Sequence, residues 1–432
     1  MVRNPFRLPS AASLWLSGLL SGLCPLAGQA QDADTLTADS RPRLTLKYAP
    51  GRVVATDKYM KKWLQEGETH ALSLETTLPL SVAGDAEPQL WGGAYLSAGL
   101  RYSLNHGTTM HRYADPSWGQ LVPVDYDSHL GNVLTLYGTL TRPFLHTRHW
   151  EVAYYIGTGI GYSHHIYNKT DAIDNEIIGS HLNIFFTAGL QAAFHVSQDL
   201  DFVGGVDFAH HSNGALARPN KGANYVSPFL GVRLPVGSGR ERQASASVAS
   251  RPDSLRFRPY TFLDFTVGIG GKTLLEDWQQ TQFDTPPTHP DYRTDDFHFY
   301  MAYSLQADIL RRWHRKFATG LGIDLFYGSY SSHVAELDRS NGYDERHSPW
   351  SVGLAVAHRA YFGRLSMHGG IGYYLFRHMG HGARELEKPY YERIGLHYLL
   401  PGLGGVSLGF SINAHATKAD FTELQLSVPV RL

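Results

Sequence analysis

The 432-residue chain has little cysteine, little charge and few long apolar runs. Its single cysteine, Cys24, lies in an amino-terminal segment that looks like an export signal. The sequence therefore excludes disulfides, thiol catalysis and cysteine metal sites in a mature chain. Charged residues make up only 18%, and the net charge of −1 lacks the basic excess expected of a nucleic-acid-binding protein. After the first 30 residues, no stretch approaches the roughly 20 apolar residues of a membrane-spanning helix.

Residues 1–30 are typical of a secretory signal peptide. Arg3 and Arg7 give the segment a basic start, and an apolar stretch follows them. Gly28 and Ala30 supply the small residues of a cleavage site, so we expect export and cleavage after Ala30. A membrane anchor is the alternative, and it fits less well because the apolar stretch is short.

The chain does contain many aromatic and glycine residues, including 25 Tyr and 44 Gly, arranged in alternating runs. Between Ala94 and Leu104, apolar residues alternate with polar ones, which gives a strand one apolar and one polar face. An apolar outside and a polar inside are typical of outer-membrane barrels. The sequence therefore predicts an all-β, antiparallel outer-membrane β-barrel fold. The expected strands are about 43–50, 70–80, 93–104, 129–141, 150–166, 179–196, 199–212, 223–234, 258–269, 297–311, 315–328, 350–362, 364–377, 390–400, 404–415 and 420–432.

Residues 237–257 interrupt this pattern. They are rich in Ser, Ala and Arg and show no period, which predicts a linker. We therefore expect an eight-stranded barrel over 31–236 and a second barrel-like half over 258–432. The alternative is one barrel of about 14–16 strands, but turns on the periplasmic side of such barrels are short, so a long polar linker favours two barrels.

The segment 207–224 contains the best candidates for catalytic residues. It joins an outward strand to a returning one. His210 and Ser212 are two residues apart, so they share one face of a strand. An imidazole beside a hydroxyl is the base–nucleophile pair of acyl transfer. Asn224 on the returning strand falls on the same face, where it is placed to orient His210.

Two further asparagines flank this pair. Asn213 and Asn220 lie in the connection between the two strands, where their amides are placed to stabilise a tetrahedral oxyanion. Phe208 shares the parity of the His–Ser pair, so that face should meet lipid. Asp207 and His211 have the opposite parity and should line the barrel interior. A reactive pair on the lipid side of the outer rim suits a substrate in the outer leaflet of the membrane.

The segment resembles the outer-membrane lipid A 3-O-deacylase family, the PagL-type acyloxyacyl hydrolases. The resemblance rests on a His-x-Ser-Asn motif at 210–213 and on a Pro-Asn-x-Gly sequence at 219–222, which includes Gly222. It implies an eight-stranded barrel for the first half, with Ser212 as the nucleophile and His210 as the base. It also implies lipid A or lipopolysaccharide as the substrate, a location in the outer membrane and no cofactor.

One position departs from the family. The third residue of the family's triad is typically Glu, and Asn224 stands at the matching position. An asparagine holds an imidazole by a hydrogen bond but does not stabilise its cation by charge. The departure keeps open a non-catalytic barrel for transport or surface structure. A lipid acyltransferase also stays open, because the same nucleophile serves hydrolysis and transfer.

The second half offers His415, Thr417 and Glu423 as the nearest counterparts of this set. Leu408, Leu424 and the residues that share their parity should face lipid, which leaves His415 and Glu423 on the interior side. We therefore expect polar packing inside a barrel there, and no second active site.

Overall fold

The structure is a computed structural model that describes residues 41–78, 94–115, 122–236, 257–381, 388–416 and 418–432. The expected signal peptide 1–30 and nearly all of the expected linker 237–257 lie outside the described residues. The chain divides into two compact units. The first comprises Ser40–Arg240 together with Lys272–Phe299, and the second contains the remaining described residues.

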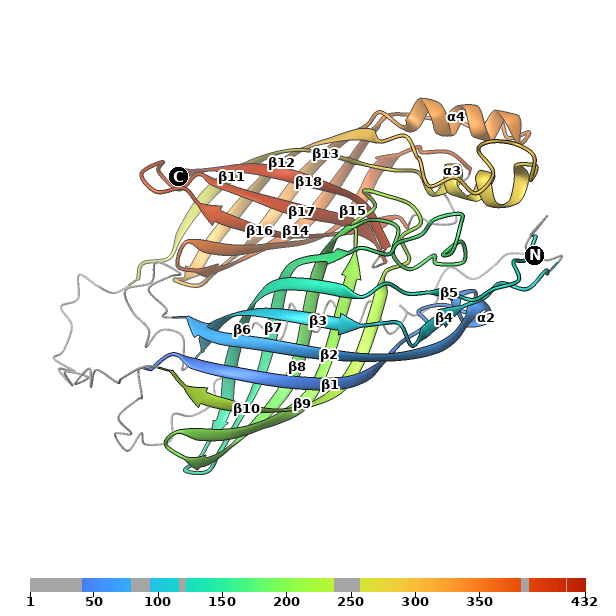
Figure 1. Cartoon of the computed structure of the whole chain (residues 1–432). Coiled ribbons are helices and arrows are strands. Elements are labelled where there is room, and N and C mark those ends of the chain that lie inside the picture. The colour runs from blue at the N-terminus through green and yellow to red at the C-terminus, as the bar shows by residue number, and fades with distance from the viewer. Residues whose placement is uncertain (1–40, 79–93, 116–121, 237–256, 382–387, 417) are drawn as a thin grey trace, which may run out of the picture. The chain divides into compact units, whose positions relative to one another are not determined.

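The first unit is built on an eight-stranded antiparallel barrel (Figure 1). Neighbouring strands pair in the order β1, β2, β3, β6, β7, β8, β9 and β10, and pairing of β10 with β1 closes the ring. The strands are β1 (Arg43–Val53), β2 (Leu64–Leu78), β3 (Tyr95–Leu104), β6 (Val133–His146), β7 (Trp150–Ser163), β8 (Leu182–Ser197), β9 (Leu200–Ser212) and β10 (Ala223–Pro235). A one-turn helix, α2 (Met60–Trp63), and two short strands, β4 (Thr108–Met110) and β5 (Ser128–His129), lie in the connections.

Alternation of side chains explains why these residues form a barrel. Along β1, Leu44, Leu46 and Tyr48 are exposed on the outer surface, whereas Thr45 and Lys47 between them are buried. The buried residues pair with one another inside: the ammonium of Lys47 contacts the carboxylate of Glu75 at 2.8 Å. An apolar outer band around a polar, ion-paired interior is the arrangement that a lipid bilayer stabilises.

The second unit is a closed barrel of eight strands, in which neighbours along the chain pair and β18 returns to β11. Its strands are β11 (Tyr260–Lys272), β12 (Tyr300–His314), β13 (Phe317–Gly328), β14 (Trp350–Phe362), β15 (Leu365–Arg377), β16 (Tyr390–Leu399), β17 (Ser407–His415) and β18 (Lys418–Arg431). A ten-residue helix, α4 (Ser331–Ser340), joins β13 to β14.

The all-β prediction and the division into two eight-stranded barrels are confirmed, and a single barrel of 14–16 strands is wrong because each set of eight strands closes on itself. All sixteen expected runs correspond to strands. The pattern did not indicate β4 and β5, which are too short to show alternation. In the described parts of the chain, no helix is long and apolar enough to cross a membrane.

One connection of the expected second half, 258–432, packs with the first unit. The segment Lys272–Phe299 joins β11 to β12, yet it packs with the first unit. It contains a short helix, α3 (Leu275–Gln279), and a π-helical turn, η5 (Gln280–Asp284). The segment has no strand period, so its packing against the first unit could not be predicted from spacing.

Candidate active site

The motif residues lie at one end of the first barrel, where β9 ends and β10 begins. We call this the site end, and the connection 213–222 the site loop. Alternation along β9 leaves Val206 and Phe208 exposed on the outer surface and buries Asp207 and His211. His210 and Ser212 follow the outer parity and are half-buried. The pair therefore lies on the lipid-facing side, as the sequence pattern indicated.

Asn224 is opposite His210 in the ladder between β9 and β10. The Nδ1 atom of His210 and the Oδ1 atom of Asn224 are 2.9 Å apart. The amide Nδ2 of Asn224 donates to the carbonyl of Gly222 at 3.3 Å, which leaves Oδ1 to face the imidazole. Because Oδ1 can only accept, Nδ1 of His210 carries the ring proton. The unprotonated nitrogen is then Nε2, the atom that a general base requires.

Gly222 allows the backbone of the site loop to pack directly against His210 and Ser212. Its φ of +75° lies in the left-handed region that favours glycine. A Cβ at this position would lie 2.6 Å from Cε1 of His210 and 3.3 Å from Cβ of Ser212. The backbone of residue 222 therefore packs against both side chains at once. Within the described residues, no hydrogen bond joins the hydroxyl of Ser212 to His210.

The two asparagines of the site loop are joined to each other. The backbone N–H of Asn213 donates to Oδ1 of Asn220 at 3.1 Å. The side chain of Asn213 is buried, and neither its Nδ2 nor its Oδ1 has a hydrogen-bond partner among the described residues. A buried amide without a partner is costly, so an unsatisfied Nδ2 donor beside Ser212 is a candidate ligand-binding group.

The interior residues of the same strands form a separate network. Nε2 of His211 and the hydroxyl of Thr135 are 2.9 Å apart. Asp207 accepts from Arg101 at 2.5 Å and from Tyr155 at 2.8 Å. His211 is therefore an interior polar residue, as its parity predicted, and it is turned away from the outer pair.

A buried ionic cluster supports the site loop, and the sequence did not indicate it. The guanidinium of Arg112 and the carboxylate of Glu176 form a fully buried pair. Burial raises the pKa of Glu176, and the charge of Arg112 opposes that shift. Lys221 extends the cluster with Nζ 3.9 Å from Glu176 and 3.3 Å from Asp57. These residues come from separate connections, so no spacing in the sequence could have joined them.

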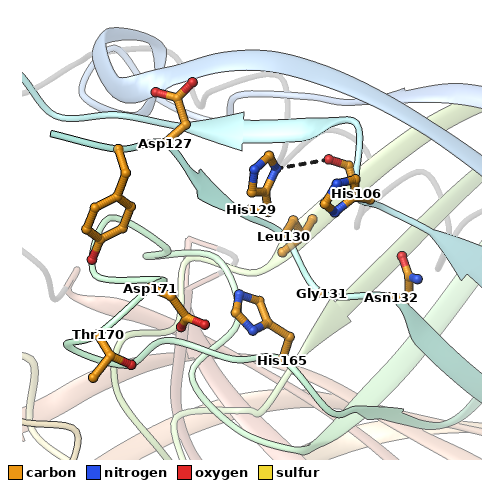
Figure 2. A pocket seen from close by; sticks show the side chains of 10 residues that line it. His106, Asp127, His129, Leu130, Gly131, Asn132, His165, Thr170 and Asp171 are labelled. Atoms are coloured by element: carbon orange, nitrogen blue, oxygen red, sulfur yellow. Dashed lines mark hydrogen bonds between the residues drawn. The ribbon is translucent and has the colours of Figure 1, made fainter. Parts of the chain in front are cut away.

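A pocket of about 560 Å³ lies among the connections of the first unit and does not contain the motif residues. Figure 2 shows His106 and His129 on one side of it, with Thr170 and Asp171 facing them from another connection. The rings of the two histidines stack at 4.4 Å, and Nδ1 of His129 donates to the carbonyl of His106 at 3.2 Å. Across the described ranges, no group of three or more His, Cys, Asp or Glu side chains is arranged to hold a metal ion.

Comparisons with known proteins give two family matches. The model of the lipid A 3-O-deacylase (PagL) family matches residues 90–233, and that of the acyloxyacyl hydrolase C-terminal domain matches residues 261–431. No curated protein matches the sequence.

Solved structures are similar at low identity. The crystal structure of the outer membrane enzyme PagL has 16% identity and a TM-score of 0.29, over 44% of this chain and 99% of its own. Neisserial surface protein A has 10% identity and a TM-score of 0.27, over 45% of this chain and 97% of its own. The siderophore receptor PirA from Pseudomonas aeruginosa has 8% identity and a TM-score of 0.20, over 90% of this chain and 80% of its own.

The two family matches fall on the two barrels and together span most of the chain. The chain therefore belongs to the PagL family of acyloxyacyl hydrolases.

Proposed function

We propose that this protein is an outer-membrane serine esterase that removes an ester-linked acyl chain from lipid A or lipopolysaccharide. The observation that carries the proposal is the hydrogen bond between His210 and Asn224 on the lipid-facing side of the barrel. It leaves Nε2 of His210 unprotonated beside Ser212, within the family that acts on lipid A. No cofactor is required by this chemistry.

The first half-reaction forms an acyl-enzyme. Nε2 of His210 takes the proton of the Ser212 hydroxyl while the oxygen attacks the ester carbonyl of the acyl chain. The tetrahedral intermediate collapses, the bond to the sugar oxygen breaks, and His210 returns its proton to that oxygen. In the second half-reaction, His210 activates water, and hydrolysis releases a fatty acid and regenerates the serine.

In this mechanism, Asn213 and Asn220 stabilise the negatively charged tetrahedral intermediate. The unpartnered Nδ2 of Asn213 is available as an oxyanion donor. Asn220 accepts the backbone N–H of Asn213 and so fixes that residue's position. Catalytic hydrogen bonds are often incomplete until substrate binds, which accounts for a Ser212 hydroxyl that does not yet contact His210.

The surroundings of the pair suit an acyl chain. Phe186 lies opposite His210 in the ladder of β8 and β9, and Ile184 lies opposite Ser212. Both follow the outer parity of β8, whose Leu182 is largely exposed. An acyl chain that remains in the bilayer reaches the serine along this apolar surface, so no deep pocket is needed.

The test is to incubate the refolded protein with lipid A in detergent micelles and to follow the mass of the lipid. We expect the loss of one acyl mass together with a free fatty acid, and no change with Ser212→Ala. Transfer of the acyl group to a second lipid would identify an acyltransferase. An unchanged lipid mass across several lipid A species, with a folded barrel, would refute the enzyme and favour a transport or surface role.

A further inference from the structure

The segment Lys272–Phe299 comes from the second half of the chain, inside the C-terminal family match, but it packs with the first unit. Its contacts are built from buried side chains: Thr273, Gln282 and Arg293 are each 3% exposed or less. Most polar side chains that are buried to this extent make specific hydrogen bonds. The partners of these bonds therefore indicate what the segment does.

The first partner is the site loop. The carbonyl of Ala215 accepts from the backbone N–H of Thr273 at 2.9 Å and from its hydroxyl at 3.2 Å. Nε of Arg218 donates to the carbonyl of Thr273 at 3.1 Å. Gly214 and Ala215 both have positive φ values, +63° and +71°. An alanine rarely adopts this conformation, so the surrounding contacts must hold the turn directly after Ser212 and Asn213.

The second partner is the connection between β7 and β8, residues 164–181, which we call the companion loop. The hydroxyl of Tyr167 donates to the carbonyl of Arg293 at 3.1 Å and accepts from Nε2 of Gln282 at 2.7 Å. Burial raises the pKa of Tyr167, so its hydroxyl stays protonated as the donor. Arg293 also donates through Nη2 to the carbonyl of Val122 at 2.5 Å.

The companion loop in turn holds the far end of the site loop. The backbone N–H of Lys221 donates to the carbonyl of Glu176 at 2.9 Å, and that of Gly222 donates to the carbonyl of Ile177 at 3.1 Å. Gly179 packs so closely that a Cβ there would lie 2.2 Å from the carbonyl oxygen of Pro219. Gly222 is the residue that packs against both His210 and Ser212.

We propose that the β11–β12 connection is a positioning element for the active site of the first barrel. Thr273 holds the start of the site loop directly, and Gln282 with Arg293 holds its end through Tyr167 and the companion loop. The second half of the chain thus contributes to the geometry of Asn213, Asn220 and Gly222. The consequence for catalysis rests on the function proposed above, whereas the effect on loop order does not.

The experiment compares two variants of the full-length protein with matched controls. Tyr167→Phe removes one hydroxyl and two hydrogen bonds, and Thr273→Val removes the hydroxyl that reaches Ala215. Thr281→Val is the control in the same segment, because among the described residues that hydroxyl bonds only to the carbonyl of Trp278, at 2.8 Å. Tyr95→Phe is the control for an interior tyrosine, because the half-buried Tyr95 is bonded to Glu151, Gln191 and Arg233 at the other end of the barrel.

Two readouts are measured on protein whose barrel is shown to be folded by heat-modifiable migration in gels. Hydrogen–deuterium exchange of the amides in 213–223 should rise several-fold in Tyr167→Phe and Thr273→Val and stay unchanged in both controls. With lipid A as substrate, kcat should fall about 3- to 30-fold while KM stays within about twofold, because the substrate surface is intact.

Unchanged exchange in both variants, or an equal rise in the controls, would overturn the proposal whatever the activity. Increased exchange with an unchanged kcat in an active wild type would also overturn the positioning role. If the wild type does not act on lipid A, the deacylase proposal fails by itself, and the exchange data alone then decide whether the connection holds the loop.

Discussion

The two barrels share a strand count and a closed topology, but the candidate site residues of the first barrel and their nearest counterparts in the second lie on different sides of the barrel wall. In the first barrel, a histidine, a serine and an asparagine lie on the outer surface at the site end. In the second, the nearest counterparts point inward: His415 is 3% exposed and contacts the hydroxyl of Tyr374 at 2.9 Å, and Glu423 is 1% exposed. The interior placement of His415 and Glu423 agrees with the parity prediction, and Thr417 lies outside the described residues.

The interior of the second barrel carries an ionic network of its own. Arg359 contacts Asp308 at 2.6 Å and Asp264 at 3.2 Å, and all three side chains are buried. Glu423 accepts from Asn413 and Gln425. Interior polarity is therefore common to both barrels and says little about activity. Polar side chains on the lipid side are more informative, because a polar group that faces lipid destabilises the barrel.

The second barrel also has a hydroxyl–imidazole pair with the outer parity. The hydroxyl of Thr319 and Nδ1 of His358 are 2.8 Å apart. This pair lies beside the β12–β13 turn, where the indole of Trp313 donates to the same hydroxyl at 3.2 Å and Phe317 stacks on the imidazole. An aromatic cluster at a strand end is typical of a membrane interface. A hydroxyl–imidazole pair alone therefore does not distinguish the two barrels, whereas the asparagine and the loop beside the first pair do.

The largest expected effect comes from replacing His210, the proposed base of the first barrel. The same substitution at His358, its geometric counterpart in the second barrel, is the comparison. His210→Gln should lower kcat/KM for lipid A by about 10³-fold or more, because the variant lacks the imidazole that takes the proton of Ser212 in the proposed mechanism. His358→Gln should leave the rate within twofold of wild type. A comparable loss in both variants would break the distinction between the barrels.

The next effect tests the close packing at the site loop. Gly222→Ala places a Cβ 2.6 Å from His210 in a left-handed backbone, so we expect a loss of about 10- to 100-fold in kcat. Gly402→Ala in the second barrel is the control, since its φ is +77° and no atom of the described residues lies within 4 Å of the added Cβ. That substitution should cost about 1 kcal/mol of stability and no activity. Equal rates for the two variants would contradict the packing argument.

A smaller effect is expected from restoring a carboxylate at position 224. Asn224→Glu should stabilise the imidazolium of His210 by charge and so favour the protonated ring. A general base must be neutral, so the acid limb of the pH–rate profile should move to higher pH. Above that limb, kcat should rise about 10-fold, because the charge assists proton transfer. An unshifted limb would show that residue 224 does not act through His210.

The smallest effect on the rate is expected from breaking the interior network of the second barrel. Asp308→Asn removes a partner of Arg359 and should lower the free energy of unfolding by about 3 kcal/mol, as measured in urea. The rate of lipid A deacylation should change less than twofold at temperatures where both barrels stay folded. A large loss of kcat in the folded variant would give the second barrel a catalytic role.

Much of this architecture follows from the sequence because alternation is a local signal. The sixteen strands, and the outer placement of His210 and Ser212, can be read from residues two apart. The hydrogen bond between His210 and Asn224 follows from their being opposite one another near a hairpin connection. Short-range motifs and parity thus predict the partners within one pair of strands.

The remaining features depend on contacts between distant connections that have no period. Arg112 meets Glu176 from another loop, and Tyr167 meets Gln282 and Arg293 from the second half of the chain. The ring tautomer of His210 is fixed by the bond from Asn224 to the carbonyl of Gly222, which requires the loop geometry itself. Such contacts are set by the folded chain, so spacing alone does not reveal them.

In the proposed mechanism, Ser212 on the lipid-facing side is a nucleophile activated by His210. The most direct measurement is labelling of the folded protein in detergent micelles with a long-chain alkyl fluorophosphonate, followed by mass spectrometry of its peptides. We expect one phosphonyl adduct per protein, located on Ser212, and no adduct in His210→Gln. A folded wild-type protein that stays unlabelled, or one labelled at another residue, would contradict the account.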